Sequence, residues 1–297
     1  MLSELKDFLT ANGIEFEVDV PMSKNTTFRI GGNADIMIFP RSVEQVRDCV
    51  CELNRENIRY ITVGNGSNLL VDDDGIRGAV IKTSRLDSVC VSGNEIVAGA
   101  GALNSKVANA ALEASLTGME FAHGIPGSIG GAVFMNAGAY GGTFADIVSE
   151  TTYVDKNGDI KTVKGKEHDF GYRHSCFSGS DIICETRLML RDGDREKIKS
   201  EMQILIEKRK TSQPLEFPSA GSFFKRPEGY FAGKLIQDSG LKGASVGGAQ
   251  VSEKHAGFII NKGGATCKDV DGLRELVQKT VFEKFGVMLE PEVKRIK

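Results

Sequence analysis

Hydrophobic residues recur along this chain with two spacings, which predict a mixture of helices and strands. A spacing of three or four residues predicts helices, because it gathers apolar side chains on one helical face. We find it in five segments: Leu5 to Leu9, ended by Gly13; Val43 to Leu53; Val107 to Ala114, ended by Gly118; Ile198, Met202, Leu205 and Ile206; and Val270 to Val281. Short apolar runs bounded by turn residues predict strands at 35–39, 59–63, 78–82, 95–98, 151–155, 160–163 and 182–190.

Capping and turn residues support several of these boundaries. Ser42 with Gln45, and Thr266 with Asp269, have the spacing of a capping box at a helix N-terminus. Asn157-Gly158 between two strand-like runs is typical of a hairpin turn. The charge-rich segment 191–197 is typical of a junction between domains. The elements therefore fall into three blocks, which we take as domains at 1–78, 79–191 and 192–297.

Composition narrows the classes of function. The chain has 297 residues, of which 40% are hydrophobic, and this is ample for a packed core. A net charge of −3 and a pI near 5.9 favour small-molecule partners over nucleic acid or an anionic membrane. No apolar run is long enough to span a bilayer and none resembles a signal peptide, so we expect a cytoplasmic protein.

Cysteine and histidine positions indicate no metal chemistry. The six cysteines form no CxxC pair and no zinc-like spacing with histidine, so we expect reduced, mostly structural thiols and no metal site. The histidines are scattered, and we expect ordinary hydrogen bonds from each: His123, His168, His174 and His255.

The most informative feature is a glycine-rich loop that follows the strand at 59–63. Consecutive backbone N–H groups from Gly64 to Asn68, with the Ser67 hydroxyl and the amides of Asn65 and Asn68, could surround a diphosphate. Leu69 stands where a dinucleotide fingerprint has its third glycine, and no helix pattern follows, so a Rossmann fold is disfavoured. An ordinary tight turn is the alternative.

A second glycine loop spans 124–142 and holds seven glycines in nineteen residues. Such a segment resists regular structure over much of its length, and its backbone should approach either a ligand or a packed sheet closely. We expect Phe134 and Met135 to belong to the core. Together, the two loops suggest a large phosphorylated ligand bound where they meet.

Further motifs, at 27–32, 171–175, 220–225, 251–261 and 289–293, accompany the two loops. With them the chain resembles the bacterial UDP-N-acetylenolpyruvoylglucosamine reductases over nearly its whole length. The resemblance implies an α+β fold of the vanillyl-alcohol-oxidase-like (PCMH-type) class: two α+β FAD-binding subdomains and a C-terminal α+β substrate domain. It also implies non-covalent FAD, NADPH as co-substrate, a UDP-sugar as substrate, and a monomer.

The implied reaction reduces UDP-N-acetylglucosamine enolpyruvate to UDP-N-acetylmuramate for peptidoglycan synthesis. Hydride passes from flavin N5 to C3 of the substrate, and a proton reaches C2. By motif, the proton donor falls on Ser222, the family's arginine on Arg173 and its late glutamate on Glu292. A cation such as Arg173 can stabilise the negative charge that develops toward the substrate carboxylate. Taken alone, the three residues could equally be a turn serine, an exposed ion-pair partner and a surface glutamate.

The resemblance also implies the binding residues. FAD contacts are expected at Gly64, Asn65, Gly66, Ser67, Asn68, Leu69, Pro126, Gly127, Ser128, Gly131, Ala132, Asn136 and Gly138, and substrate contacts at Tyr172, Arg209, Lys225 and Gln250. Some family members insert a tyrosine-bearing loop where this chain has only 175–180, so it resembles the shorter subclass, in which Arg209, Gln213 or Lys225 could compensate.

Two other functions stay open on the sequence. One is an FAD-dependent oxidase or dehydrogenase of a hydroxy acid or sugar lactone on the same fold. The other is a nonenzymatic nucleotide-sugar binding protein without a redox cofactor.

Overall fold

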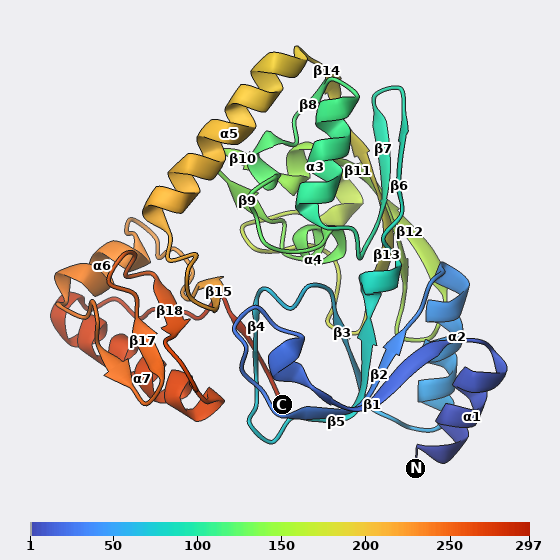
Figure 1. The fold of residues 1–297 in the computed structure, drawn as a ribbon, viewed down its shortest axis with the longest axis horizontal. Coiled ribbons are helices and arrows are strands. Elements are labelled where there is room, and N and C mark those ends of the chain that lie inside the picture. Colours follow the sequence, from blue (N-terminus) through green and yellow to red (C-terminus); the bar gives the residue numbers. More distant parts are fainter. Residues whose placement is uncertain (1) are drawn as a thin grey trace. The chain divides into compact units, whose positions relative to one another are not determined.

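A computed structural model describes residues 2–297, and within it the chain forms two compact units (Figure 1). Unit 1 contains residues 2–18, 35–65 and 78–208. Unit 2 contains residues 19–34, 66–77 and 209–297. Unit 2 is thus assembled from three separate stretches of sequence. The three-domain division with boundaries after residues 78 and 191 stays a prediction.

The first part of unit 1 centres on a four-stranded sheet covered by two helices. Its strand order is β1-β2-β5-β3: β1 (Glu15–Pro21), β2 (Asn33–Phe39), β5 (Ile76–Lys82) and β3 (Tyr60–Val63). Helices α1 (Ser3–Ala11) and α2 (Val43–Arg55), both drawn in blue, lie beside one another (Figure 1). Their buried side chains pack with those of the sheet, as the helical spacing predicted: Leu5, Leu9, Val46, Val50 and Leu53 with Ile36, Ile38 and Ile81.

Half of the capping box predicted for α2 is present. The Ser42 hydroxyl accepts a hydrogen bond from the Gln45 N–H at 3.2 Å. The Gln45 side chain, however, accepts from the N–H of Arg41 at 2.8 Å and not from that of Ser42. The reciprocal bond is therefore displaced by one residue.

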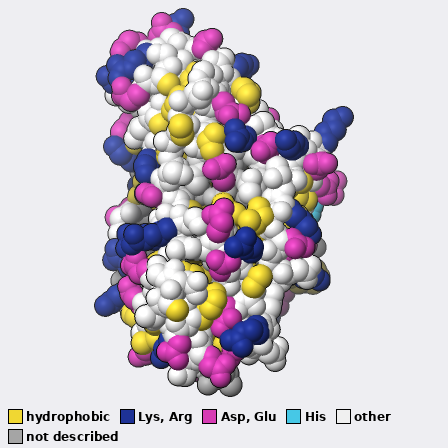
Figure 2. Space-filling view, turned by 90° about the vertical axis from the view of Figure 1, so that its right-hand side faces the viewer, with side chains coloured by type: hydrophobic (Ala, Val, Ile, Leu, Met, Phe, Trp, Pro, Cys, Tyr) yellow, Lys and Arg dark blue, Asp and Glu magenta, His cyan; other side chains and the backbone are white. Residues whose placement is uncertain are grey.

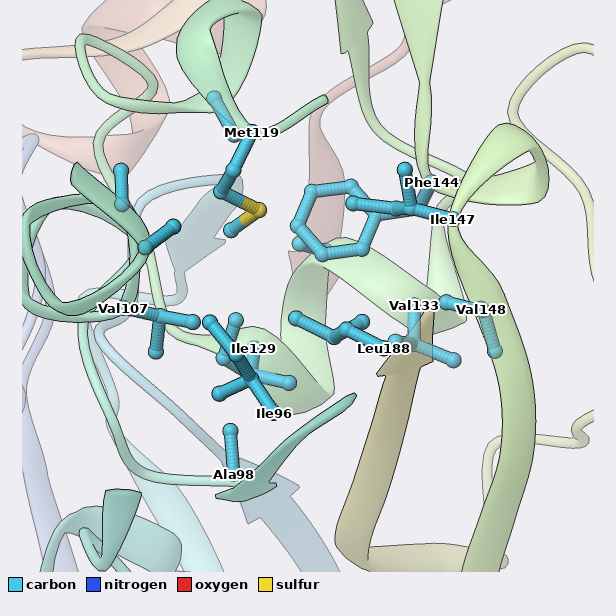
Figure 3. Packing of buried hydrophobic residues seen from close by; sticks show 14 of the residues in the cluster. Ile96, Ala98, Val107, Met119, Ile129, Val133, Phe144, Ile147, Val148 and Leu188 are labelled. Carbon is cyan, nitrogen blue, oxygen red and sulfur yellow. The ribbon is translucent and has the colours of Figure 1, made fainter. Parts of the chain in front are cut away.

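The second part of unit 1 is an antiparallel five-stranded sheet. Its strand order is β12-β11-β13-β7-β6: β12 (Ile160–Lys164), β11 (Val148–Val154), β13 (Ile182–Met189), β7 (Glu95–Gly99) and β6 (Val89–Ser92). Helices α3 (Asn104–Glu113) and α4 (Ile129–Phe134) pack against this sheet, and Figure 3 shows Val107 of α3 and Ile129 of α4 pointing toward Ile96 of β7. Because α4 is part of the second glycine loop, this core packs directly against that loop.

The predicted hairpin joins β11 to β12. Gly158 has a positive φ of 87°, which glycine adopts without strain. The Asp155 carboxylate accepts from the N–H groups of Asn157 at 2.8 Å and Asp159 at 3.0 Å, and from Lys161 Nζ at 2.5 Å. The hydrogen bond from Lys161 is the main reason why the pKa of Asp155 falls to about 2.

One expectation for unit 1 is wrong, and another holds only in part. α3 ends before Gly118: Ser115 takes the left-handed conformation at φ 57°, and the short strand β8 (Leu116–Thr117) follows. The second glycine loop is irregular over much of its length, as its composition predicted, but it also contains the short helix α4. Burial of Ile129 and Val133 in the core outweighs the low helix propensity of the glycines around them.

Unit 2 contains a second four-stranded sheet and the C-terminal helices. Strand order is β15-β18-β17-β16: β15 (Ser219–Ser222), β18 (Phe258–Asn261), β17 (Ala249–Val251) and β16 (Ser245–Val246). Helices α6 (Ala232–Asp238) and α7 (Cys267–Phe285) pack with one another. The capping box of Thr266 and Asp269 is complete, and the predicted inward residues of α7 are fully buried: Val270, Leu273, Val277 and Val281.

Early segments of the chain complete this unit. Strand β4 (Leu69–Val71) pairs in parallel with β19 (Lys294–Ile296). The Asp73 carboxylate accepts from the first N–H groups of α7, those of Cys267 at 2.7 Å and Lys268 at 3.1 Å. Asp73, almost two hundred positions earlier in the sequence, therefore caps the N-terminal end of α7.

The remaining elements are short, apart from one long helix. Helix α5 (Arg195–Ser212) buries Ile198 and Met202, whereas the other two residues predicted for its apolar face, Leu205 and Ile206, are only partly buried. The short strands are β9 (Gly138–Ala139), β10 (Gly142–Thr143) and β14 (Arg191–Asp192). Lys and Arg side chains are interspersed with Asp and Glu over the face shown in Figure 2. Within residues 2–297, no helix has the length and apolarity required to cross a membrane.

Candidate flavin and substrate site

The two glycine loops meet inside unit 1, at Gly64 and Ser128. Strand β3 ends at Val63, which pairs in register with Lys82 at the end of β5, and Gly64 follows directly. A Cβ atom on Gly64 would lie 2.3 Å from Ser128 Oγ and 3.9 Å from Thr83 Oγ1. Only glycine fits at position 64 without displacing the serine. The expectation that the loops come together is confirmed at this point.

The Ser128 hydroxyl is buried without a protein partner. Ser128 is 2% exposed, and its Oγ forms no hydrogen bond within the described residues 2–297. It occupies the N-cap position of α4 but makes no capping bond. A buried hydroxyl left unsatisfied costs about 1–3 kcal/mol. An atom of a ligand that bonds to this hydroxyl would remove that cost.

The neighbouring glycines divide into packed and open positions. A Cβ on Gly130 would lie 2.8 Å from the Cβ of Ala100, so close packing explains this glycine. A Cβ on Gly131 would meet only Ser128 Oγ, at 3.9 Å, which leaves space beside the unsatisfied hydroxyl. An unsatisfied donor beside an open glycine face is what a polar cofactor requires. The residues present therefore fit FAD.

Several other residues expected to contact the cofactor also pack closely against protein groups. Gly66 has a φ of 65°, and a Cβ there would lie 2.3 Å from the Asn25 carbonyl oxygen. A Cβ on Gly138 would lie 2.8 Å from the Gly142 carbonyl oxygen. The Asn68 amide donates to the Glu292 carbonyl at 3.2 Å, and Leu69 is the first residue of β4. Roles in FAD binding stay predictions for these residues and for Asn65, Ser67, Pro126, Gly127 and Ala132.

Lys82 is a residue that our sequence analysis missed. Its side chain is only 9% exposed, and burial lowers its pKa to about 8. The signal in the sequence is a lysine that closes the apolar run Ala79 to Ile81 just where the strand ends. A buried cation beside the start of the first glycine loop adds positive charge where we expect an anionic cofactor.

In unit 2, the structure brings Ser222 and Glu292 together although seventy residues separate them. The N–H of Glu292 donates to the carbonyl of Phe223, the residue after Ser222, at 2.8 Å. Gly221 has a φ of 79° and lies at an irregularity in the pairing of β15 with β18. Such a bulge redirects the next side chain, and Ser222 is exposed. A surface hydroxyl and a carboxylate-bearing segment thus share one edge of unit 2.

Arg173 lies in unit 1, at the tip of a tight turn. The turn is closed by the N–H of Gly171 donating to the His174 carbonyl at 3.1 Å, and by the reverse bond at 3.3 Å. Tyr172 and Arg173 form the tip, where the Arg173 guanidinium lies 5.1 Å from the centre of the Tyr172 ring. The predicted catalytic residues therefore come from both units, and their common role stays a prediction.

The remaining predicted substrate residues lie in unit 2 and contact protein groups. Arg209 donates to the Gln213 side chain at 3.1 Å, so two of the three residues suggested as compensating for the missing loop are hydrogen-bonded to one another. Lys225 forms an ion pair with Glu290 at 3.1 Å. The Gln250 amide donates to the Gly243 carbonyl at 3.2 Å and accepts from Lys262 at 3.0 Å. A ligand would have to share or replace these bonds.

The histidines largely form the ordinary hydrogen bonds that were expected. His168 is fully buried between the Gly165 carbonyl and the Thr151 hydroxyl, each at 2.9 Å, and His255 accepts from the Gly257 N–H at 3.1 Å. His123 differs, because its buried Nδ1 has no partner within residues 2–297; burial lowers its pKa. All six cysteines are free, and three of them are buried: Cys49, Cys184 and Cys267.

Two protein-family models match the chain. The model of an FAD binding domain matches residues 34–164, and that of the C-terminal domain of UDP-N-acetylenolpyruvoylglucosamine reductase matches residues 213–296. The enzyme of that name from Clostridium novyi (strain NT) is 50% identical over 281 residues, which cover 94% of this chain and 92% of the relative. The one from Caldanaerobacter subterraneus subsp. tengcongensis is 48% identical over 295 residues, covering 99% and 97%.

Solved structures agree with the sequence relatives. UDP-N-acetylenolpyruvylglucosamine reductase from Thermus caldophilus superposes with a TM-score of 0.82 at 34% identity, covering 96% of this chain and 99% of the other. A berberine bridge enzyme, at 17% identity and a TM-score of 0.51, covers 65% and 44% and shares the fold alone. The predicted α+β FAD-binding fold is confirmed, and FAD is the cofactor. The chain belongs to the UDP-N-acetylenolpyruvoylglucosamine reductase family, whose members are flavoprotein oxidoreductases.

Proposed function

We propose that this protein reduces UDP-N-acetylglucosamine enolpyruvate to UDP-N-acetylmuramate at the expense of NADPH, as a step of peptidoglycan precursor synthesis. The names of relatives that are about 50% identical over nearly the whole chain support this reaction. Such a reaction belongs in the cytoplasm, and we propose a monomer as the working form. The observation that carries the proposal is the exposed Ser222 on its glycine bulge, one residue from the backbone bond to Glu292.

Ser222 is proposed as the proton donor to C2 of the substrate. A serine hydroxyl is a weak acid, but the carbon that it would protonate is strongly basic once C3 has received hydride. Position therefore matters more than acidity. Hydrogen bonds of Phe223 to Gly257 and Glu292, both at 2.8 Å, fix the backbone beside Ser222 and so limit where its hydroxyl can reach.

Arg173 and Glu292 are proposed to bind the carboxylate end of the substrate. A guanidinium can stabilise the negative charge that moves toward that carboxylate during reduction. Glu292 would hold the same region through a hydrogen bond or a shared proton. Ser128 and the backbone around Gly64 and Gly131 would hold FAD, which supplies the hydride to C3 when bound.

A spectroscopic experiment tests the proposal. The visible absorption of the purified protein is recorded anaerobically, then after NADPH, then after the enolpyruvyl UDP-sugar. We expect a flavin band that bleaches with NADPH and returns with the sugar. Return of the band only on admission of oxygen would favour the oxidase alternative, and a protein that binds the UDP-sugar without redox change would favour the binding protein.

Replacing Ser222 tests its role. Ser222→Ala should keep the flavin band and its bleaching by NADPH but should slow return of the band with the sugar by at least about 100-fold, because general acid catalysis contributes roughly that much. Ser200→Ala is the matched control, since Ser200 is an exposed serine on α5. An unchanged rate of return in Ser222→Ala would remove Ser222 from the acid role.

A further inference from the structure

The turn that carries Arg173 adopts a conformation that needs support from its surroundings. Arg173 has a φ of 55°, in the left-handed region. A residue with a side chain takes this conformation only at an energetic cost. Two backbone bonds between Gly171 and His174 close the turn, but a closed turn can still move as a whole. Other residues must therefore fix its place in unit 1.

Asn136 contacts the base of this turn directly. Its Nδ2 donates to the Gly171 carbonyl at 3.0 Å, and its Oδ1 accepts from the Ala145 N–H at 2.9 Å. The residue is 7% exposed and has a φ of 40°, just after the end of α4. Both ends of its amide are thus used within unit 1. The Gly171 carbonyl accepts from His174 and from Asn136 together.

Ser175 anchors the other side of the turn. Its hydroxyl donates to the Phe134 carbonyl at 2.7 Å, and the residue is 4% exposed. Phe134 is the last residue of α4, and this hydrogen bond satisfies a carbonyl that the helix itself leaves without a partner. Hydrogen bonds therefore hold the turn on both sides to the C-terminal end of α4. The N-terminal end of the same helix directly follows Ser128.

We infer that Asn136 and Ser175 are positioning residues that hold the Tyr172–Arg173 turn against α4. The value of this arrangement for the reaction rests on the proposed function of Arg173. The expected contact of Asn136 with FAD stays a prediction; its side chain links the segment expected to hold FAD to the segment that presents the arginine. Placement of the arginine is then set by the second glycine loop.

Limited trypsin digestion tests the inference without relying on catalysis. Trypsin cuts after Arg173 only when the turn opens, so the rate of cleavage between Arg173 and His174 reports how firmly the turn is held. In Asn136→Asp the carboxylate can still accept from Ala145, but it cannot donate to the Gly171 carbonyl and repels it. The FAD-bound protein is digested and the fragments are followed by mass spectrometry. We expect cleavage between Arg173 and His174 to be at least about tenfold faster in Asn136→Asp than in the parent protein.

A matched control and a second variant complete the design. Asn94→Asp makes the same substitution at an exposed position between β6 and β7 and should leave cleavage after Arg173 unchanged. Ser175→Ala removes the second anchor and should accelerate cleavage in the same way, should Asn136→Asp fail to fold. Cleavage as slow as in the parent protein in both variants would overturn the inference.

Kinetics separate this inference from the proposed function. If the turn acts through Arg173, Asn136→Asp should slow oxidation of the reduced enzyme by the sugar but should have no further effect in an Arg173→Ala background. Faster cleavage with unchanged kinetics would support the anchoring and refute the role of Arg173. Slower kinetics with unchanged cleavage would refute the anchoring and leave the role of Arg173 intact.

Discussion

Ser128 offers a test of whether the meeting point of the glycine loops is a cofactor site. Its hydroxyl is buried and unsatisfied in the protein alone. Ser128→Ala removes that unsatisfied group, so the free energy of unfolding of the FAD-free protein should stay the same or rise by up to about 1 kcal/mol. If the hydroxyl bonds to FAD, the same substitution removes one hydrogen bond worth about 0.5–1.5 kcal/mol, which weakens FAD binding roughly two- to tenfold.

Two assays measure these opposite effects. Urea unfolding of the FAD-free protein gives its stability, and titration with FAD, followed by flavin fluorescence, gives the dissociation constant. Ser42→Ala is the matched control, because its hydroxyl is satisfied as the N-cap of α2. That variant should lose about 1 kcal/mol of stability and keep its FAD affinity. Lower stability with unchanged FAD affinity in Ser128→Ala would refute the reasoning.

Gly64→Ala extends the test to the other loop. The new Cβ would lie 2.3 Å from Ser128 Oγ, a clash that should lower stability by about 1–2 kcal/mol. In the double variant Gly64→Ala, Ser128→Ala, the nearest neighbours become Ser128 Cβ at 3.6 Å and Thr83 Oγ1 at 3.9 Å, which are ordinary distances. The two substitutions should therefore compensate one another, and purely additive effects would show that these residues are not in contact.

Two further predictions concern stability. Asp73→Asn should lower the free energy of unfolding by about 1 kcal/mol in urea melts, because the charged cap at the start of α7 is lost, whereas Asp74→Asn, which caps no helix, should change it little. Asp155 has a pKa of about 2 in the folded protein, below the ordinary value of 3.8, so its stabilising effect is present above about pH 4 and is lost as the pH falls through 2. Asp155→Asn should accordingly flatten the fall in unfolding free energy between pH 4 and 2, and Asp159→Asn should not; equal slopes in all three proteins would contradict the assignment.

Segments whose local signals agree could be predicted from the sequence. In α7 the apolar spacing, the capping box and the inward residues all proved correct, and so did the hairpin at Asn157-Gly158. These features depend on residues within a few positions of one another. Local signals did not predict α4. Its glycine-rich composition favours a loop, but burial of its apolar side chains against residues distant in sequence stabilises a helix.

The candidate site likewise combines features that could be predicted from the sequence with features that could not. That the two glycine loops would meet was predicted from their composition, and Gly64 does face Ser128. The bond from Asn136 to Gly171 could not be predicted, because it joins residues thirty-five positions apart through a single amide. Nor could spacing predict that Glu292 lies beside Phe223. Only the resemblance to a family pointed to Ser222 and Glu292 together.

The discontinuous make-up of unit 2 has a consequence for biosynthesis. On the ribosome, residues 19–34 and 66–77 appear long before residues 209–297, with which they share a hydrophobic core. Strand β4 must wait for β19, at residues 294–296, before its partner exists. Phe28, Ile30 and Leu70 therefore lack their core partners in the nascent chain until residues 209–297 have been synthesised, and apolar side chains exposed in this way are prone to aggregation.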